Sequence, residues 1–305
     1  MLESFFVAIV NFVPSIFVFF IIFSCLILVH EWGHFFTARK CGVKVLEFGL
    51  GMGKKLFSKK RGGVEYTINA VPFGGFVRML GEEEKSNDPR SFEKAKLWKR
   101  MSITLAGIFM NFVAATVALT ILFSVGTAPI LITQQNILDA EIAGLVVLDE
   151  PDENGDRAIL EISNIQKPVG AAFIFSITES WRISGAIVDK LAEIPSEIIQ
   201  HGRLPEGMAG PVGIAEATHK ILPMGFLAIL KLWALLSLSL AVINLLPIPA
   251  LDGGRFLFQI VEFVLWPFRV KINSKLENAV HVGGYVALMG LLVAVTWNDI
   301  VRIFF

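Results

Sequence analysis

Four apolar stretches, each long enough to cross a lipid bilayer, constrain this chain more than any other feature of its sequence. They cover about 5–29, 103–125, 224–247 and 282–305. The hydrocarbon core of a bilayer is about 30 Å thick, and a helix needs roughly 20 residues to span it. Since 54% of the 305 residues are hydrophobic, the sequence predicts an α-helical membrane protein with four transmembrane helices.

The first apolar stretch is predicted to stay in the mature protein as a transmembrane helix. A cleavable signal peptide has a basic start and a small-residue cleavage site after its apolar run. The chain begins Met1-Leu-Glu-Ser, without a basic residue, and no such cleavage site follows the run. We therefore count this stretch among the four helices.

The formal net charge of zero hides a segregation of charge along the chain. Residues 39–100 contain 15 basic and 7 acidic residues, whereas 127–220 contain 6 basic and 14 acidic ones. Basic flanks remain on the cytoplasmic side of a membrane. The pattern predicts that both chain ends and 127–222 lie outside, while 39–100 and the region around 252–280 lie inside. Without further evidence, both charge blocks are treated as solvated faces rather than as binding surfaces.

The apolar stretches divide the chain into segments with distinct expected structures. Between the first two helices, 45–81 combines a glycine-rich run with strand-like alternation, which predicts a small membrane-associated β-region. Apolar residues at helical spacing predict an amphipathic helix over about 171–200, within a short extracytoplasmic cap. The expected segments are 1–38 (first transmembrane helix), 39–101 (β-region and connector), 102–126 (second helix), 127–222 (extracytoplasmic segment), 223–280 (third helix and a following inner-face helix) and 281–305 (fourth helix).

A His-Glu-x-x-His motif lies at the inner end of the first apolar stretch, in Val29-His-Glu-Trp-Gly-His-Phe. Residues four apart on a helix share nearly the same face, so His30 and His34 can bind one zinc ion. Glu31 can then reach a water molecule on the metal. The alternative is a pair of boundary histidines bonded to neighbouring helices. Because ionisable residues inside a membrane are costly and by default functional, we favour the metal site.

A catalytic zinc normally has three protein ligands, so the two histidines need a third donor. The chain has only five histidines, and its two cysteines have no metal-binding spacing. The charge pattern places His201 and His219 on the outer side. His281, near the start of the last helix, stays open as a lesser candidate.

Asp252 is the better candidate, because it follows the third apolar stretch at its inner end. Pro247 and Pro249 would break the preceding helix. The pair Gly253-Gly254 permits a close backbone approach. Taken alone, this run is typical of an ordinary helix end.

At these residues the chain resembles the site-2 protease family (peptidase family M50) of intramembrane zinc metalloproteases, especially its bacterial regulator of sigma-E protease branch. The resemblance covers most of the chain outside about 127–200. Members of this branch usually carry PDZ domains between the second and third helices, and the 127–170 segment is too short for a full one. Besides the zinc motif and Asn244…Asp252-Gly253, the matching segments are Phe48-Gly-Leu-Gly-Met-Gly, Pro72-Phe-Gly-Gly-Phe-Val-Arg-Met-Leu, Ala209-Gly-Pro-Val-Gly-Ile-Ala and Asn298-Asp-Ile.

The resemblance implies a role for individual residues. It implies that His30, His34 and Asp252 bind Zn²⁺ and that Glu31 is the catalytic base. It also implies that the β-region over about 62–80 pairs with an unwound substrate strand. The residues expected to contact the substrate are Gly74, Gly75 and Phe76 in that region, and Asn244, Pro247 and Pro249 beside the metal.

The implied function is that of a zinc metalloendopeptidase in a bacterial cell (inner) membrane, acting in regulated intramembrane proteolysis. Its expected partners are a single-pass membrane protein or membrane-bound peptide remnant and the lipid bilayer, with no nucleic acid. The alternative is a membrane metal transporter or a metal-binding pseudoprotease. A glutamate between the two histidines favours hydrolysis, because transport needs no such base. A purely structural scaffold would leave the His/Glu/Asp cluster unexplained.

Overall fold

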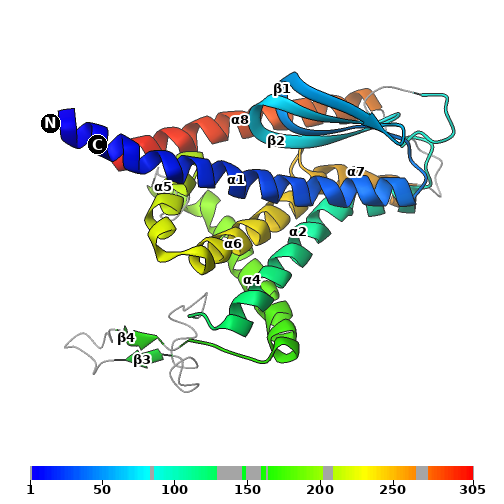
Figure 1. Cartoon of the computed structure of the whole chain (residues 1–305). Helices are drawn as coiled ribbons and strands as arrows, with labels where there is room; N and C mark the ends of the chain where they lie inside the picture. The colour runs from blue at the N-terminus through cyan, green and yellow to red at the C-terminus, as the bar shows by residue number, and fades with distance from the viewer. Residues whose placement is uncertain are drawn as a thin grey trace.

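The computed structural model describes residues 2–82, 86–128, 146–148, 159–162, 164–201, 209–265 and 274–304. Most of these residues are helical (Figure 1). The helices are α1 (Leu2–Lys40), α2 (Leu97–Val125), α4 (Val169–His201), α5 (Pro211–Ile221), a 3₁₀ turn η1 (Leu222–Met224), α6 (Phe226–Leu245), α7 (Asp252–Leu265) and α8 (Ser274–Phe304). The strands are β1 (Val45–Arg61), β2 (Val64–Met79), β3 (Val146–Leu148) and β4 (Ile159–Ile162).

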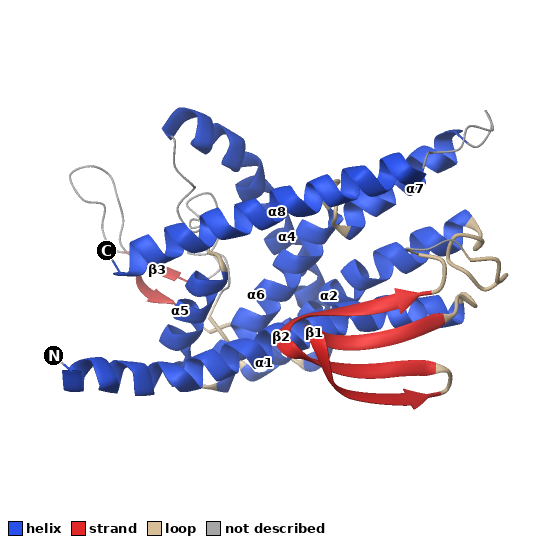
Figure 2. Ribbon diagram, turned by 90° about the horizontal axis from the view of Figure 1, so that it is seen from above, coloured by secondary structure: helices blue, strands red, loops and turns tan. Residues whose placement is uncertain are grey.

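Four of the described helices are long and apolar enough to cross a membrane, which confirms the predicted fold class. Their apolar spans are Val13–Lys40, Leu97–Val125, Phe226–Leu245 and Ala279–Ile303. The start of α1 and the end of α8 lie at the same end of the molecule in both views, as an even number of crossings requires (Figures 1 and 2). The protein is therefore a multi-pass membrane protein.

The first two helices extend further into polar sequence than the apolar stretches predicted. Helix α1 continues past 29 through the zinc motif to Lys40, and α2 begins at Leu97 rather than near 103. Both extensions have a buried side, since Phe35 and Ala38 on α1 and Leu97 on α2 are buried. Packing of α1 on the neighbouring sheet, and of α2 on α1 and α7, explains the added turns, because hydropathy does not register such tertiary contacts.

Strands β1 and β2 form a curled antiparallel sheet beside the second half of α1 (Figure 2). Both strands bend, so that 45–50 pairs on one side with 65–68 and on the other with 75–79. The last part of β1 in turn pairs with 64–69. The order across the sheet is therefore 75–79, 45–50, 64–69 and 55–61, which leaves 75–79 as an edge without a further strand among the described residues.

The buried residues form two clusters on either side of the zinc motif. One cluster joins α2, α4 and α6 and contains Leu119, Leu122, Phe123, Ile183 and Leu238. The other packs the sheet against the neighbouring ends of α1 and α2 and contains Phe35, Ala38, Val45, Val77, Met79 and Ile103. The second cluster fixes the sheet on α1, which determines where the edge 75–79 lies.

The segment 127–222, expected to be extracytoplasmic, is described only in part. Helix α4 covers the predicted amphipathic region, and its buried face packs on α2 and α6 through Ala172, Ser176 and Ser180. Such small residues let helices approach closely. Strands β3 and β4 form a short hairpin. The expectation about a PDZ domain concerns 127–170, most of which lies outside the described residues.

Candidate metal centre

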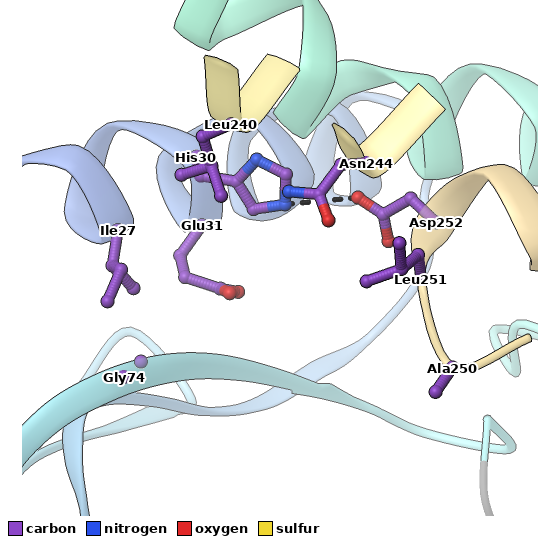
Figure 3. Close-up of a pocket in the computed structure, with 10 residues that line it drawn as sticks. Ile27, His30, Glu31, Gly74, Leu240, Asn244, Ala250, Leu251 and Asp252 are labelled. Atoms are coloured by element: carbon purple, nitrogen blue, oxygen red, sulfur yellow. Dashed lines mark ion pairs between the residues drawn. The ribbon is translucent and has the colours of Figure 1, made fainter. Parts of the chain in front are cut away.

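Helix α1 presents His30, Glu31 and His34 in its C-terminal part, and all three lie within an apolar span. Both imidazoles are buried, each with 8% of its residue surface exposed. In Figure 3, the side chain of Glu31 extends into the space between α1 and β2, while His30 points toward Asp252. One turn of helix therefore holds two nitrogen donors together and places a carboxylate beside them.

A sharp reversal of the chain between α6 and α7 places Asp252 beside the histidines. Gly253 and Gly254 make this reversal possible, because a Cβ on either would lie 2.2–2.3 Å from a carbonyl oxygen of the preceding turn. Ala250 adopts a positive φ of 77°, which side chains other than glycine rarely accept. Its backbone N–H is held by Nδ1 of His281 at 3.0 Å. As the first residue of α7, Asp252 faces back toward α1.

Three donor atoms from α1 and α7 meet at one point. The Oδ2 atom of Asp252 lies 3.0 Å from Nε2 of His30 and 3.2 Å from Nε2 of His34. The two Nε2 atoms are 3.1 Å apart. Adjacent ligands of a tetrahedral zinc are about 3.3 Å apart, given bonds of about 2.0–2.1 Å. Among the described residues, this is the group of histidine, cysteine and carboxylate side chains placed to hold a metal ion.

The surroundings of the histidines leave their Nε2 atoms available as metal ligands. Nδ1 of His34 lies 2.8 Å from the carbonyl oxygen of Ile103 and must donate its proton there, so the neutral ring carries a lone pair on Nε2. Nδ1 of His30 lies 3.2 Å from the side-chain amide of Asn111. The nearer atom of this amide is Nδ2, while its oxygen hydrogen-bonds to none of the described residues. A half-turn of the amide brings the oxygen to Nδ1, where it accepts the ring proton.

The chemistry of this donor set fits zinc. Two lone pairs on nitrogen and a carboxylate oxygen converge with no proton to share among them, an arrangement that a cation stabilises. Oδ2 of Asp252 is also buried without a satisfying hydrogen bond. The Nδ1 partners on α2 are of the kind that orient metal-binding histidines. The residues present therefore suit a zinc site with three protein ligands and one open position.

Sequence reasoning missed two residues of α2 that shape this site, Gly107 and Asn111. A Cβ on Gly107 would lie 2.4 Å from Nε2 of His34 and 2.7 Å from Cε1 of His30, so only glycine leaves room for both rings. Gly33 on α1 similarly lies against the carbonyl of Ala106. The available signal was a buried asparagine and a glycine four residues apart in an apolar span.

Replacing Gly107 by alanine is expected to lower zinc affinity by fivefold to more than a hundredfold. The added methyl group would displace an imidazole, and overpacking of this kind costs about 1–3 kcal/mol. Zinc content after dialysis against a buffered zinc series measures the effect. Gly290→Ala on α8 is the matched control, because nothing lies within 4 Å of its Cβ position. Equal zinc affinity in the two variants would show that α2 does not shape the site.

A cavity of about 260 Å³ opens beside the three donor atoms. It is bounded by α1, α6, α7 and the bend of β2 (Figure 3). A Cβ on Gly75 would lie 2.8 Å from Ile27 and 3.3 Å from Cγ of Glu31, so glycine there lets β2 approach α1. The lining residues are Ile27, His30, Glu31, Gly74, Gly75, Leu240, Asn244, Ala250, Leu251 and Asp252.

The structure separates the residues expected at the site into two groups. Gly74, Gly75 and Asn244 line the cavity with the donor atoms, whereas Phe76 and Pro247 do not. The ring of Phe76 covers Gly49 within the sheet, and Pro247 is exposed in the loop before α7. A contact of either residue with a substrate stays a prediction.

The remaining histidines have other roles or positions. His281 holds the backbone of Ala250, and Nδ1 of His219 lies 2.8 Å from the hydroxyl of Ser15 on α1. His201 is the last residue of α4. None of the three belongs to the donor group at the metal centre.

Comparison with known proteins gives one consistent family. The model of peptidase family M50 matches residues 18–291. A protein of Clostridium perfringens is 32% identical over 327 aligned positions, covering 92% of this chain and 96% of that protein. The regulator of sigma-W protease RasP of Bacillus subtilis is 27% identical, covering 96% of this chain and all of that protein. The zinc metalloprotease RasP of Bacillus licheniformis is also 27% identical, covering 95% and 99%.

Proposed function

Because the chain belongs to peptidase family M50 and is a membrane zinc metalloprotease of the site-2 type, we propose that it cleaves single-pass membrane proteins, or membrane-bound peptide remnants, in regulated intramembrane proteolysis. One observation carries the proposal. The donor residues His30 and Asp252 line one cavity together with Glu31 and with Gly75 at the edge of β2, and His34 completes the donor group beside it. A substrate helix reaching this depth would meet all of them at once.

We assign the zinc ion to His30, His34 and Asp252. When bound there, zinc polarises the scissile carbonyl and lowers the pKa of a coordinated water to about 7. Glu31 is the catalytic base in this proposal. Its carboxylate accepts a proton from the attacking water and returns it to the nitrogen of the departing amine. The position of Glu31 at the cavity wall supports this role.

A substrate helix must unwind before its backbone can react, because its carbonyls are bonded internally. The 75–79 segment of β2 is an edge of the sheet among the described residues, and Gly75 in this segment lines the cavity. An unwound substrate segment can therefore add to this edge as a further strand. Gly74 and Gly75 would let the substrate backbone approach closely. Asn244 lines the same cavity, and its side-chain amide would hydrogen-bond the substrate backbone beside the metal.

The charge segregation supports an orientation for the protein in a bacterial inner membrane. The basic segment 39–100 contains the sheet and lies at the end of α1 that carries the zinc motif. Basic flanks stay in the cytoplasm. The metal centre would therefore lie toward the cytoplasmic side, with both chain ends outside.

Removal of the metal is expected to abolish cleavage, and added zinc to restore it. The full chain is reconstituted in proteoliposomes with a single-pass substrate, dialysed against a chelator and then supplied with zinc. A substrate whose membrane segment contains Gly and Pro should be cut faster than an all-leucine one, because its helix unwinds more easily. The proposal fails if cleavage continues in metal-free protein. Zinc flux into these vesicles without cleavage would instead favour the transporter.

A further inference from the structure

We propose that the protein binds the phosphate group of an anionic lipid in a second cavity, where α1 ends and α2 begins. This basic cavity has a volume of about 270 Å³ and shares no lining residue with the cavity at the metal centre. Its wall consists of 41–43 after α1, and of 89–91, 94–96 and Lys99 around the start of α2. The two helix ends lie side by side, on the right in Figure 1, and Nζ of Lys99 donates to the carbonyl of Cys41 at 2.7 Å.

The charges around the basic cavity favour an anion. Arg90, Lys94, Lys96 and Lys99 line it, and none of the lining side chains is acidic. Arg90 is paired with Asp88, and its hydrogen bonds lower the pKa of Asp88 to about 2. Lys94 and Lys99 donate to backbone carbonyls, which hold the ammonium groups in place without neutralising them. A positive charge therefore remains at the cavity.

Two neutral features of the cavity also lack a partner that an anion would supply. Ser91 lines the cavity and is fully buried, yet its hydroxyl makes no hydrogen bond with the described residues. A buried hydroxyl without a partner is costly, so a phosphate oxygen that reached it from the cavity would stabilise it. Helix α2 begins here after Lys96 with no side-chain cap, and a helix N-terminus attracts negative charge.

The position of the basic cavity favours a lipid phosphate over a free one. The span of α1 ends at Lys40 and that of α2 begins at Leu97, so the cavity lies level with the bilayer surface. Trp98 is 59% exposed and Phe36 is 49% exposed, as is typical of aromatic residues at a membrane interface. Lipid head groups are concentrated at this depth, and anionic ones attract basic side chains there.

The proposal is tested by titrating the purified full chain in neutral detergent with phosphatidylglycerol, phosphatidylcholine or inorganic phosphate, and counting bound molecules by native mass spectrometry. The wild type is expected to bind phosphatidylglycerol about tenfold more tightly than phosphatidylcholine, the difference that one charged hydrogen bond makes. The double variant Lys94→Gln/Lys96→Gln should lose this preference. Lys54→Gln/Lys59→Gln, on the exposed part of β1, removes the same charge elsewhere and should keep it.

Ser91→Ala separates binding from folding. Because the hydroxyl has no partner among the described residues, its loss should leave the lipid-free melting temperature unchanged or raised, while phosphatidylglycerol binds about threefold to tenfold more weakly. A lower lipid-free melting temperature would give the hydroxyl a structural role and overturn its assignment. Equal affinity for inorganic phosphate would make this a free-anion site. If both lysine double variants lost the preference for phosphatidylglycerol equally, the preference would come from general electrostatic attraction rather than from this cavity. Either of these last two results would overturn the proposal.

Discussion

Replacing Glu31 by glutamine is expected to lower the rate of peptide cleavage by about 10²–10⁴-fold, the usual contribution of a general base, while zinc stays bound. The amide has nearly the shape of the carboxylate but cannot accept the proton of the attacking water. Glu31 is not one of the three converging donors, so the metal content should match the wild type. Cleavage of a single-pass substrate in proteoliposomes, measured beside the zinc content of the same samples, tests both parts.

Glu193→Gln is the matched control for this variant. It makes the same chemical change on the exposed side of α4, where Glu193 pairs only with the side chain of Lys190 among the ion pairs of the described residues. Its cleavage rate should be that of the wild type. An active Glu31→Gln enzyme would refute the assignment of the base, and a Glu31→Gln protein without zinc would show that Glu31 helps to hold the metal.

The fold class could be predicted from the sequence because hydropathy over 20 residues reports directly on bilayer thickness. The ends of the helices could not be predicted in the same way. The end of α1 packs on the curled sheet through Phe35 and Ala38, whereas the start of α2 contacts α7 through the Arg100–Glu262 ion pair. The amino-acid composition of these helix ends does not indicate that packing.

The proximity of His30 and His34 followed from their spacing alone, since four residues make about one helical turn. The approach of Asp252 did not follow from spacing, because 218 residues separate it from His34. Its position depends on two glycines at which a Cβ would lie 2.2–2.3 Å from a carbonyl oxygen, and on the strained backbone of Ala250. The prolines and glycines of residues 247–254 indicated a turn. The direction in which this turn leads the chain is seen only in the structure.

The contribution of α2 to the metal centre was the part least accessible to sequence reasoning. Gly107 and Asn111 contain no metal-binding group of their own and matter because of what they lie against. A glycine in an apolar helix is common in membrane proteins. Only the contact with two imidazole rings distinguishes Gly107 from Gly290, whose Cβ position is open.

Replacing Asp252 by alanine is expected to weaken zinc binding by more than a hundredfold and to abolish cleavage. Loss of a residue that merely orients a ligand costs about tenfold to a hundredfold in metal affinity, and Asp252 supplies one of three donor atoms directly in the proposed site. Metal analysis after dialysis against a buffered zinc series gives the affinity. Melting temperature in the same detergent shows whether the variant is still folded.

Two further variants make the assignment of Asp252 specific. Asn244→Ala changes a residue that lines the same cavity without joining the donor group, so zinc should remain while cleavage slows. His281→Ala removes the other candidate for third ligand. His281 holds the backbone of Ala250 and packs against the ring of Phe258, so we expect its loss to shift zinc affinity far less than the loss of Asp252. If His281→Ala lost zinc while Asp252→Ala retained it, the third ligand would come from α8, and the arrangement of the metal centre proposed here would be wrong.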